Sequence, residues 1–270
     1  MDSPRRVTED IHVLPSYFPM PGFGLVPVNA FVLKAMQPVL IDTGLHQDGA
    51  DFMNGLRSVI DPSDLRWLWL THPDQDHVGS LRTLMQEVPH LRLVTTFLGY
   101  GILSLFEQIP LDRVYLLNPG ESLDVGDRRL TAYKPPTFDN PATTGFYDSK
   151  SGALFSSDCF GALVNAPADE AEAIGADELR RGQVLWTSID SPWLHKVDQR
   201  KFAAELGVVR EMDPKVVLSS HLPPASSLTQ TFLSSLASVP DAQPFVGPNQ
   251  AALEMMLAGM TQGKEPAAVG

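Results

Sequence analysis

In the first part of the chain, segments with the hydrophobic pattern of a strand alternate with segments whose hydrophobic residues recur at helical spacing. Apolar runs at 11–14, 29–33 and 38–41 predict three strands. Between the first two, Tyr17 to Pro27 carries prolines and glycines among aromatic residues, a composition that predicts a loop. Apolar residues at helical spacing predict a helix over 47–60. A strand over 65–70 and a helix over 80–86 are predicted next.

The rest of the chain first turns β-rich and then returns to helices. A strand over 92–95 and a helix over 99–108 are followed by strands predicted at 122–125, 129–134, 144–147 and 153–156. Helices are predicted at 168–181, 197–212, 226–238 and 248–260, with one strand at 215–219. We expect a single mixed α and β domain over 1–270, with a flexible tail at about 263–270.

Composition narrows the possible partners. The chain of 270 residues has a net charge of -12, which disfavours nucleic acid and anionic membranes as partners. Cys159 is the only cysteine, so neither an intramolecular disulfide nor a thiolate metal cage can form. The N-terminus lacks the apolar core of a signal peptide, and no apolar run approaches the ~20 residues of a membrane span. These features predict a cytoplasmic protein without a membrane segment.

Four possible metal ligands follow the strand predicted over 65–70: His72, Asp74, Asp76 and His77. A strand that ends in such a cluster carries it to the edge of a sheet, where imidazole and carboxylate groups can converge. With almost no cysteine in the chain, the pattern favours a cation bound by nitrogen and oxygen. The alternative is a polar turn that caps the next helix.

Two later residues occupy similar positions. Asp158 follows the strand predicted over 153–156, and His221 follows the strand predicted over 215–219. Taken singly, Asp158 could be a helix cap or a turn residue, and His221 a solvated turn histidine. Because both follow apolar strands, as the 72–77 cluster does, we include them among the candidate ligands.

The segment 72–77 resembles the signature of the metallo-β-lactamase superfamily, which is His-x-His-x-Asp-His in most hydrolases and His-x-Glu-x-Asp-His in flavodiiron proteins. Asp74 matches neither form. Two other segments, Leu-Phe-Ser-Ser-Asp-Cys-Phe-Gly at 154–161 and Ser-His at 220–221, resemble the flavodiiron branch, over roughly residues 10–225. This resemblance implies a four-layer αββα sandwich, a bridging Asp158 and a head-to-tail homodimer.

The family also has a third histidine between these segments, and this chain has no histidine between residues 90 and 195. In the family, Pro follows that histidine after two residues and Tyr after eight. Pro141 and Tyr147 stand at those offsets from Asp139, which lies 19 residues before Asp158 (158 − 139). We therefore infer that Asp139 replaces the histidine. The alternative is an Asp-Asn-Pro turn with no metal role.

The resemblance implies two adjoining metal sites that share Asp158. Site one would contain His72, Asp74 and Asp139, and site two would contain Asp76, His77 and His221. Two divalent ions would balance four carboxylates that otherwise repel one another. Site two resembles non-haem iron ligation, and site one offers a harder donor set suited to iron or manganese. Iron is favoured, with zinc or manganese as alternatives, and a single ion at site two also stays open.

Other residues have weaker claims to a role near the metal ions. Asp42 matches a superfamily position that organises loops, so we expect it to support the ligands from behind. His46, Trp193 and His195 could approach the site, although structural roles are the simpler interpretation.

Two enzyme classes and one non-enzyme role fit these motifs. The favoured hypothesis is a dinuclear, iron-binding protein that binds or reacts with dioxygen or a small oxidant. Flavodiiron proteins draw electrons from an adjoining flavodoxin-like domain, for which this chain is too short. The hypothesis therefore needs a separate electron donor, an organic substrate as reductant, or a sensing role without turnover. The alternative is a hydrolase of a lactone, thioester or phosphoester, in which a metal-bound hydroxide attacks and Asp76 is the catalytic base. The third possibility is a site kept only for structure or binding.

Overall fold

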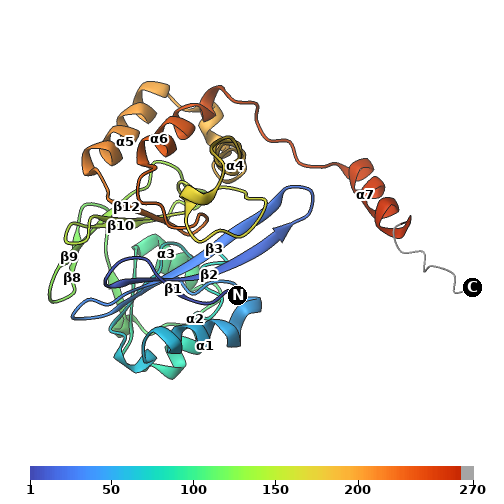
Figure 1. Cartoon of the computed structure of the whole chain (residues 1–270). Coiled ribbons are helices and arrows are strands. Elements are labelled where there is room, and N and C mark those ends of the chain that lie inside the picture. Colours follow the sequence, from blue (N-terminus) through green and yellow to red (C-terminus); the bar gives the residue numbers. More distant parts are fainter. Residues whose placement is uncertain (263–270) are drawn as a thin grey trace, which may run out of the picture.

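The computed structural model describes residues 1–262, which form two β-sheets with helices outside them (Figure 1). The seven-stranded sheet has the order β1-β2-β3-β4-β5-β6-β7, and the five-stranded sheet the order β12-β11-β10-β9-β8. The strands of the first sheet are β1 (Arg5–Arg6), β2 (Ile11–Met20), β3 (Gly24–Leu33), β4 (Val39–Ile41), β5 (Trp67–Trp69), β6 (Arg92–Thr95) and β7 (Val114–Leu116). Those of the second are β8 (Ser122–Asp124), β9 (Arg129–Tyr133), β10 (Gly145–Asp148), β11 (Ala153–Ser157) and β12 (Val216–Ser219). The tail expected at 263–270 lies outside the described residues.

The helices divide between the two outer faces. Three helices pack on the first sheet: α1 (Gly49–Val59), α2 (Leu81–Glu87) and α3 (Phe97–Leu103). Three pack on the second: α4 (Ala176–Asp190), α5 (Gln199–Met212) and α6 (Thr229–Ala237). Helix α7 (Gln250–Gln262) stands away from the body at the end of an extended segment (Figure 1). Short 3₁₀ turns lie between these elements at 46–48, 62–64, 111–113, 171–173, 192–196 and 239–241.

Successive side chains of a strand point to opposite faces of the sheet, and this alternation explains the four layers. In β5, Trp67 and Trp69 point into the cluster between the two sheets, whereas Leu68 points into the cluster under α1, α2 and α3. In β11, Phe155 belongs to the cluster between the sheets, and Leu154 to the cluster under α4, α5 and α6. Strands buried on both faces therefore read as continuous apolar runs. The predicted αββα sandwich is confirmed.

The loop predicted over Tyr17 to Pro27 is wrong. Strands β2 and β3 pair without interruption from Ile11↔Leu33 to Met20↔Gly24 and form a long hairpin. The prolines suggested a loop because proline cannot donate to a strand ladder. Beyond Val13, however, β2 has no partner strand on its other side, because β1 pairs with it only at residues 12 and 13. Of the prolines in this segment, Pro19 lies in that part of β2, Pro21 in the turn, and Pro27 in β3 before its pairing with β4 begins at Phe31. None of the three therefore has strands paired on both sides.

The helix predicted over 168–181 is displaced toward the C-terminus. A 3₁₀ turn occupies 171–173, and α4 begins at Ala176 and continues to Asp190. Gly175 precedes the helix and Pro192 follows it, so α4 runs between two residues that disfavour helix. This shift carries the end of α4 toward the candidate ligands. Among the described residues, no helix is both long and apolar enough to cross a bilayer.

Candidate metal centre

The candidate ligands leave the carboxyl ends of strands in both sheets. The segment with His72 and His77 follows β5, which runs parallel to β4 and β6. Asp158 follows β11 and His221 follows β12, and these two strands are also parallel neighbours. Parallel strands end at the same edge of a sheet, so their following turns meet there. The site therefore lies at one end of the sandwich, where both sheets contribute to it.

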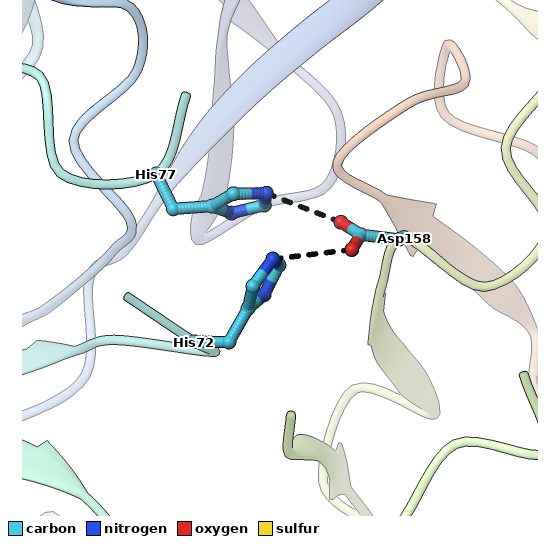
Figure 2. Close-up of side chains that lie close together, drawn as sticks. All are labelled: His72, His77 and Asp158. Carbon is cyan, nitrogen blue, oxygen red and sulfur yellow. Dashed lines mark ion pairs between the residues drawn. The ribbon is translucent and has the colours of Figure 1, made fainter. Parts of the chain in front are cut away.

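Asp158 stands at the centre of the cluster (Figure 2). Its Oδ2 lies 3.2 Å from Nε2 of His72, and its Oδ1 lies 3.1 Å from Nε2 of His77. Oδ1 is also 3.1 Å from Nε2 of His221. The two carboxylate oxygens thus face two different groups of donors. This is the geometry expected of a carboxylate that bridges two cations.

The group around Oδ2 contains the residues predicted for site one. Nε2 of His72 lies 3.8 Å from a carboxylate oxygen of Asp74 and 3.8 Å from one of Asp139. The side-chain amide of Asn140 donates to Asp74 Oδ1 at 2.8 Å and holds that carboxylate in place. One histidine and three carboxylates form a donor set that is rich in oxygen.

The group around Oδ1 contains the residues predicted for site two. Asp76 Oδ1 lies 3.7 Å from Nε2 of His77, and Asp76 Oδ2 lies 3.5 Å from Nε2 of His221. These three side chains can offer donor atoms that all lie within 4.8 Å of one another. The structure therefore brings together all seven predicted ligands, in the two predicted groups. Their role as ligands stays a prediction.

Two buried polar atoms at the centre of the cluster form no hydrogen bond. Asp158 is 2% exposed and His77 is 1% exposed, and Asp158 Oδ1 lies 3.1 Å from His77 Nε2, yet among the described residues neither atom has a hydrogen bond of acceptable geometry. Leaving buried polar groups unsatisfied costs roughly 1–3 kcal/mol each. The same atoms are nitrogen and oxygen donors suited to divalent cations. The residues present therefore fit a pair of metal ions.

Each of the three histidines is fixed through its other ring nitrogen. Nδ1 of His77 lies 2.9 Å from Oδ2 of Asp42, and Nδ1 of His221 lies 2.8 Å from the carbonyl oxygen of Pro27. Nδ1 of His72 lies 3.2 Å from the hydroxyls of both Thr71 and Ser157. A proton on Nδ1 of His77 and His221 leaves the Nε2 lone pair directed toward the site. The expectation that Asp42 supports the ligands from behind agrees with this contact.

Two of these supporting residues have a left-handed backbone. Asp42 has φ 56° and Ser157 has φ 54°, both outside the regions that non-glycine residues prefer. Asp42 is held there by Thr71, whose backbone N–H and hydroxyl both donate to its carboxylate, at 2.8 and 2.9 Å. Such strained positions are common at functional sites, because the surrounding structure fixes them.

In the absence of metal, burial and the neighbouring carboxylates shift the pKa values of the cluster. Burial favours neutral rings, but the carboxylates of Asp76 and Asp158 raise the pKa of His77 well above its usual value. Burial likewise opposes a charge on His221, yet Asp158 and Asp76 raise its pKa to about 9. Burial and the carboxylates of Asp158 and Asp74 raise the pKa of Asp139 to about 7. Protons therefore balance the charge that metal ions would otherwise balance.

Asp190 is a site residue that the sequence analysis missed. Asp139, Asp158 and Asp190 can each offer an oxygen within 4.8 Å of the others. Burial and the carboxylates of Asp158 and Asp139 raise the pKa of Asp190 to about 8. It ends a helix rather than a strand and belongs to none of the quoted motifs. Asp190 can be recognised as a site residue only once the C-terminal end of α4 is known.

Trp186 packs one side of the site and fixes helix α4 to it. Its indole ring lies against that of His221, with centroids 4.4 Å apart, and its Nε1 donates to the backbone carbonyl of Asp158 at 3.1 Å. This contact requires glycine at position 161, since a Cβ there would lie 2.5 Å from Trp186 Nε1 and 2.8 Å from His221 Cβ. Trp193, in contrast, only supports the Asp139 loop, by donating to the carbonyl of Phe138 at 2.9 Å.

An apolar pocket of about 530 Å³ reaches site two. Asp76 lies in its wall together with Trp186, so a molecule in the pocket would contact a candidate ligand. His46 also lines the pocket, as the sequence analysis allowed. Its other walls come from the β2–β3 hairpin and from the segments before α1 and α2: Phe18, Met20, Val26, Val28, Leu45, Gln47 and Gln75. Within the described residues, no lysine or arginine lines this pocket.

Sequence comparison places the chain in a family. Residues 26–221, more than half of the chain, match the model of the ODP family beta lactamase, and the protein belongs to this family. The anaerobic nitric oxide reductase flavorubredoxin of Salmonella typhi is 28% identical over 151 residues, which cover 53% of this chain and 32% of that protein. A flavorubredoxin homolog of Escherichia coli O157:H7 is 27% identical over 151 residues, 37% of its length. The matches therefore cover about a third of these relatives.

Solved structures share the fold. The rubredoxin oxygen:oxidoreductase of Desulfovibrio gigas superposes with a TM-score of 0.78 at 20% identity, covering 90% of this chain and 63% of that one. The flavodiiron protein of Giardia intestinalis superposes with a TM-score of 0.76 at 15% identity, covering 89% of this chain and 60% of that one. The chain thus has the fold of the metallo-β-lactamase-like domain of flavodiiron proteins, as its motifs predicted.

Proposed function

We propose that this protein holds two metal ions, favouring iron, and binds or reduces dioxygen or a related small oxidant such as nitric oxide. The observation that carries the proposal is the division of Asp158 between two donor groups, one oxygen toward His72 and the other toward His77 and His221. The names of the relatives, a nitric oxide reductase and an oxygen:oxidoreductase, agree with this chemistry. Zinc and manganese are the alternative metals.

The proposed ligands would form two metal sites. Site one would be held by His72, Asp74 and Asp139, site two by Asp76, His77 and His221, and Asp158 would join them. When bound, a pair of redox-active ions supplies open coordination positions and electrons to a small oxidant.

Asp76 stands between the pocket and site two and is the proposed catalytic residue. Burial alone would favour its protonated form, but the charges of His77 and His221 lower its pKa. It would therefore present a carboxylate at the pocket wall, able to accept a proton from a reacting molecule. The apolar pocket suits a small uncharged molecule such as dioxygen. Reduction of such a molecule would also need electrons from a donor.

The first experiment determines the metals of protein purified without added metal, compared with Asp158→Asn. As a control, Asp177→Asn removes an exposed carboxylate from α4. We expect about two irons per chain in the wild type and in the control, and a large loss in Asp158→Asn. The reduced wild type should then consume dioxygen or nitric oxide at a rate that falls with metal content. Zinc that persists after growth in iron-rich medium would contradict the redox proposal.

A hydrolase is the second candidate function, and Asp76 favours it. A carboxylate in the pocket wall could act as base for a metal-bound hydroxide that attacks a lactone or thioester. Phosphoesters suit the site less well, since within the described residues no lysine or arginine lines the pocket to bind a phosphate. Turnover of lactone or thioester substrates by the zinc-loaded protein, lost in Asp76→Asn, would favour this alternative over oxidant chemistry.

A further inference from the structure

The carboxylate of Asp190 lies beside site one without an assigned role. Asp139 and Asp158, which belong to the proposed site, can each place an oxygen within 4.8 Å of an oxygen of Asp190. Donor atoms on opposite sides of one ion lie up to about 4.4 Å apart, twice a typical metal–oxygen distance. The separation of these three carboxylates is therefore close to that of groups sharing a cation.

The attachment of α4 determines the position of Asp190. Trp186 donates to the carbonyl of Asp158, and the side-chain amide of Gln183 donates to the carbonyl of Phe160 at 3.1 Å. Residues 183, 186 and 190 are spaced by three and four along the helix, so they share one face. The contacts that hold α4 against the segment after β11 thus also direct Asp190 toward the cluster.

The immediate surroundings do not compensate the charge of Asp190. It is the last residue of α4, where the helix dipole disfavours a negative charge. Its hydrogen bond is donated by the hydroxyl of Ser191, at 3.0 Å. Within residues 1–262, no lysine, arginine or histidine forms an ion pair with it. A cation held by the neighbouring residues would balance a negative charge at this position.

An imidazole beside these carboxylates is a second indication of a bound cation. Asp158, which can place an oxygen within 4.8 Å of Asp190, is almost fully buried, and its Oδ2 lies 3.2 Å from Nε2 of His72. Nε2 of His72 also lies 3.8 Å from a carboxylate oxygen of Asp139. The carboxylates beside Asp190 therefore share a nitrogen donor, and the group contains both donor types that a divalent cation binds.

We infer that Asp190 is a further ligand of the ion at site one, an inference that rests on the proposed metal centre. Site one would then offer one imidazole and up to four carboxylates. Such a donor set favours iron or manganese over zinc, which prefers more nitrogen or sulfur. Asp190 would add a carboxylate on the side of site one where Asp139 stands in place of the family histidine.

The test compares Asp190→Asn with Asp177→Asn, the exposed control on the same helix. Metal-free protein is dialysed anaerobically against increasing Fe²⁺, and separately against Mn²⁺ and Zn²⁺, and bound metal per chain is measured. The wild type and the control should bind two ions. Asp190→Asn should bind one of them at least tenfold more weakly, and its preference for Fe²⁺ and Mn²⁺ over Zn²⁺ should decline. The conservative variant Asp190→Glu, which keeps the carboxylate, should recover part of this affinity.

The possible failures can be told apart. A wild type that binds no ion overturns the metal centre and this inference together. A wild type that binds two ions, with Asp190→Asn binding both at unchanged affinity, overturns only the role of Asp190. Thermal unfolding of the metal-free variant is measured alongside, and a transition at or above that of the wild type shows that weaker binding reflects a lost ligand and not a lost fold.

Discussion

At the scale of single residues, the geometry of the candidate metal centre is set by groups behind the proposed ligands as well as by the proposed ligands themselves. Asp42 accepts from Nδ1 of His77 and from two groups of Thr71, so it fixes both the ring and the segment after β5. Second-layer partners of this kind maintain the tautomer and orientation of a ligating histidine. We therefore expect Asp42 to affect metal binding although it would not contact the ions.

We predict that Asp42→Asn weakens metal binding at site two about 10–100-fold. The amide would present a donor where the carboxylate accepts two hydrogen bonds, and this would disturb the His77 ring. Fe²⁺ titration of the metal-free protein measures the effect, with Asp177→Asn as the matched control. An unchanged affinity would show that the ring is held by packing alone.

Metal retention should depend on pH. In the metal-free protein, partial burial and neighbouring carboxylates raise the pKa of Asp139 to about 7, and the pKa of His221 is raised to about 9, because Asp158 and Asp76 outweigh the effect of its burial. Both groups hold protons at lower pH, and an entering cation must displace them. Affinity should therefore increase with pH and be lost as pH falls below about 7. Metal content after dialysis between pH 5.5 and 8.5 tests this, and Asp139→Asn should flatten the dependence near pH 7.

The residues of the site differ in how readily they can be predicted from the sequence. His72, His77, Asp158 and His221 each follow an apolar strand, and strand ends can be recognised locally. Asp139 lies in a loop between strands, so it could be predicted only from the positions of Pro and Tyr relative to the third histidine of the family that the sequence resembles. Asp190 could not be predicted, since it reaches the cluster only through the packing of a whole helix on a distant segment.

At the scale of elements, the hairpin β2–β3 shows why local composition misleads. Its prolines and glycines are typical of a loop, yet the pairing with β3 and the exposed edge of β2 accommodate them. Strands such as β5 and β11 were predictable because burial on both faces makes them apolar throughout. Strands β1 and β7 lack that signal, because they have only 2 and 3 residues and are partly exposed, and they went unpredicted.

A second element-scale feature is the turn between β8 and β9. Arg128 pairs with Asp148 at 3.0 Å and with Asp127 at 2.8 Å, and it also contacts Asp10 before β2. Asp148 is fully buried, and Arg128 is 4% exposed. The turn thus links β10 to the N-terminal end of the other sheet through a buried ion pair.

We predict that Arg128→Ala lowers the free energy of unfolding by roughly 3–5 kcal/mol, because it leaves Asp148 buried without a counterion. Urea denaturation measures the loss. Arg82→Ala breaks the exposed pair with Glu107 and should lower the free energy of unfolding much less. Metal content per folded chain should stay unchanged in both variants. Equal losses of unfolding free energy in the two variants would contradict the expected effect of burial.

At the scale of the whole molecule, the proposed ligands come from both sheets. His72 and His77 come from the segment after β5, whereas Asp158 and His221 follow β11 and β12. An ion bound by both groups would connect two halves that otherwise meet through their apolar faces. A ligand that binds only the folded state stabilises it by about 4 kcal/mol at a thousand times its dissociation constant.

Loading with iron should therefore raise the melting temperature by on the order of 10 °C, at about 2–4 °C per kcal/mol for a chain somewhat shorter than this one. Calorimetry with and without a chelator measures the shift. Asp158→Asn should melt at the same temperature under both conditions. A similar shift in that variant would mean that the chelator acts elsewhere.

The family resemblance also implies a head-to-tail homodimer, which stays a prediction. In such an arrangement the partner's surface would cover the pocket beside Asp76. Light scattering of the metal-loaded protein should give twice the mass of 29.5 kDa. A monomer at micromolar concentration would leave the pocket open to solvent and to a donor protein.

Helix α4 connects the pocket with the carboxylate cluster. Trp186 lines the pocket, and Asp190 lies four residues, or about one turn, further along the same helix. A shift of this turn of α4 would move both side chains, so a ligand that displaces the helix at Trp186 would also change the position of a carboxylate beside site one. Binding in the pocket and coordination of the ion would then be coupled through a single helical turn.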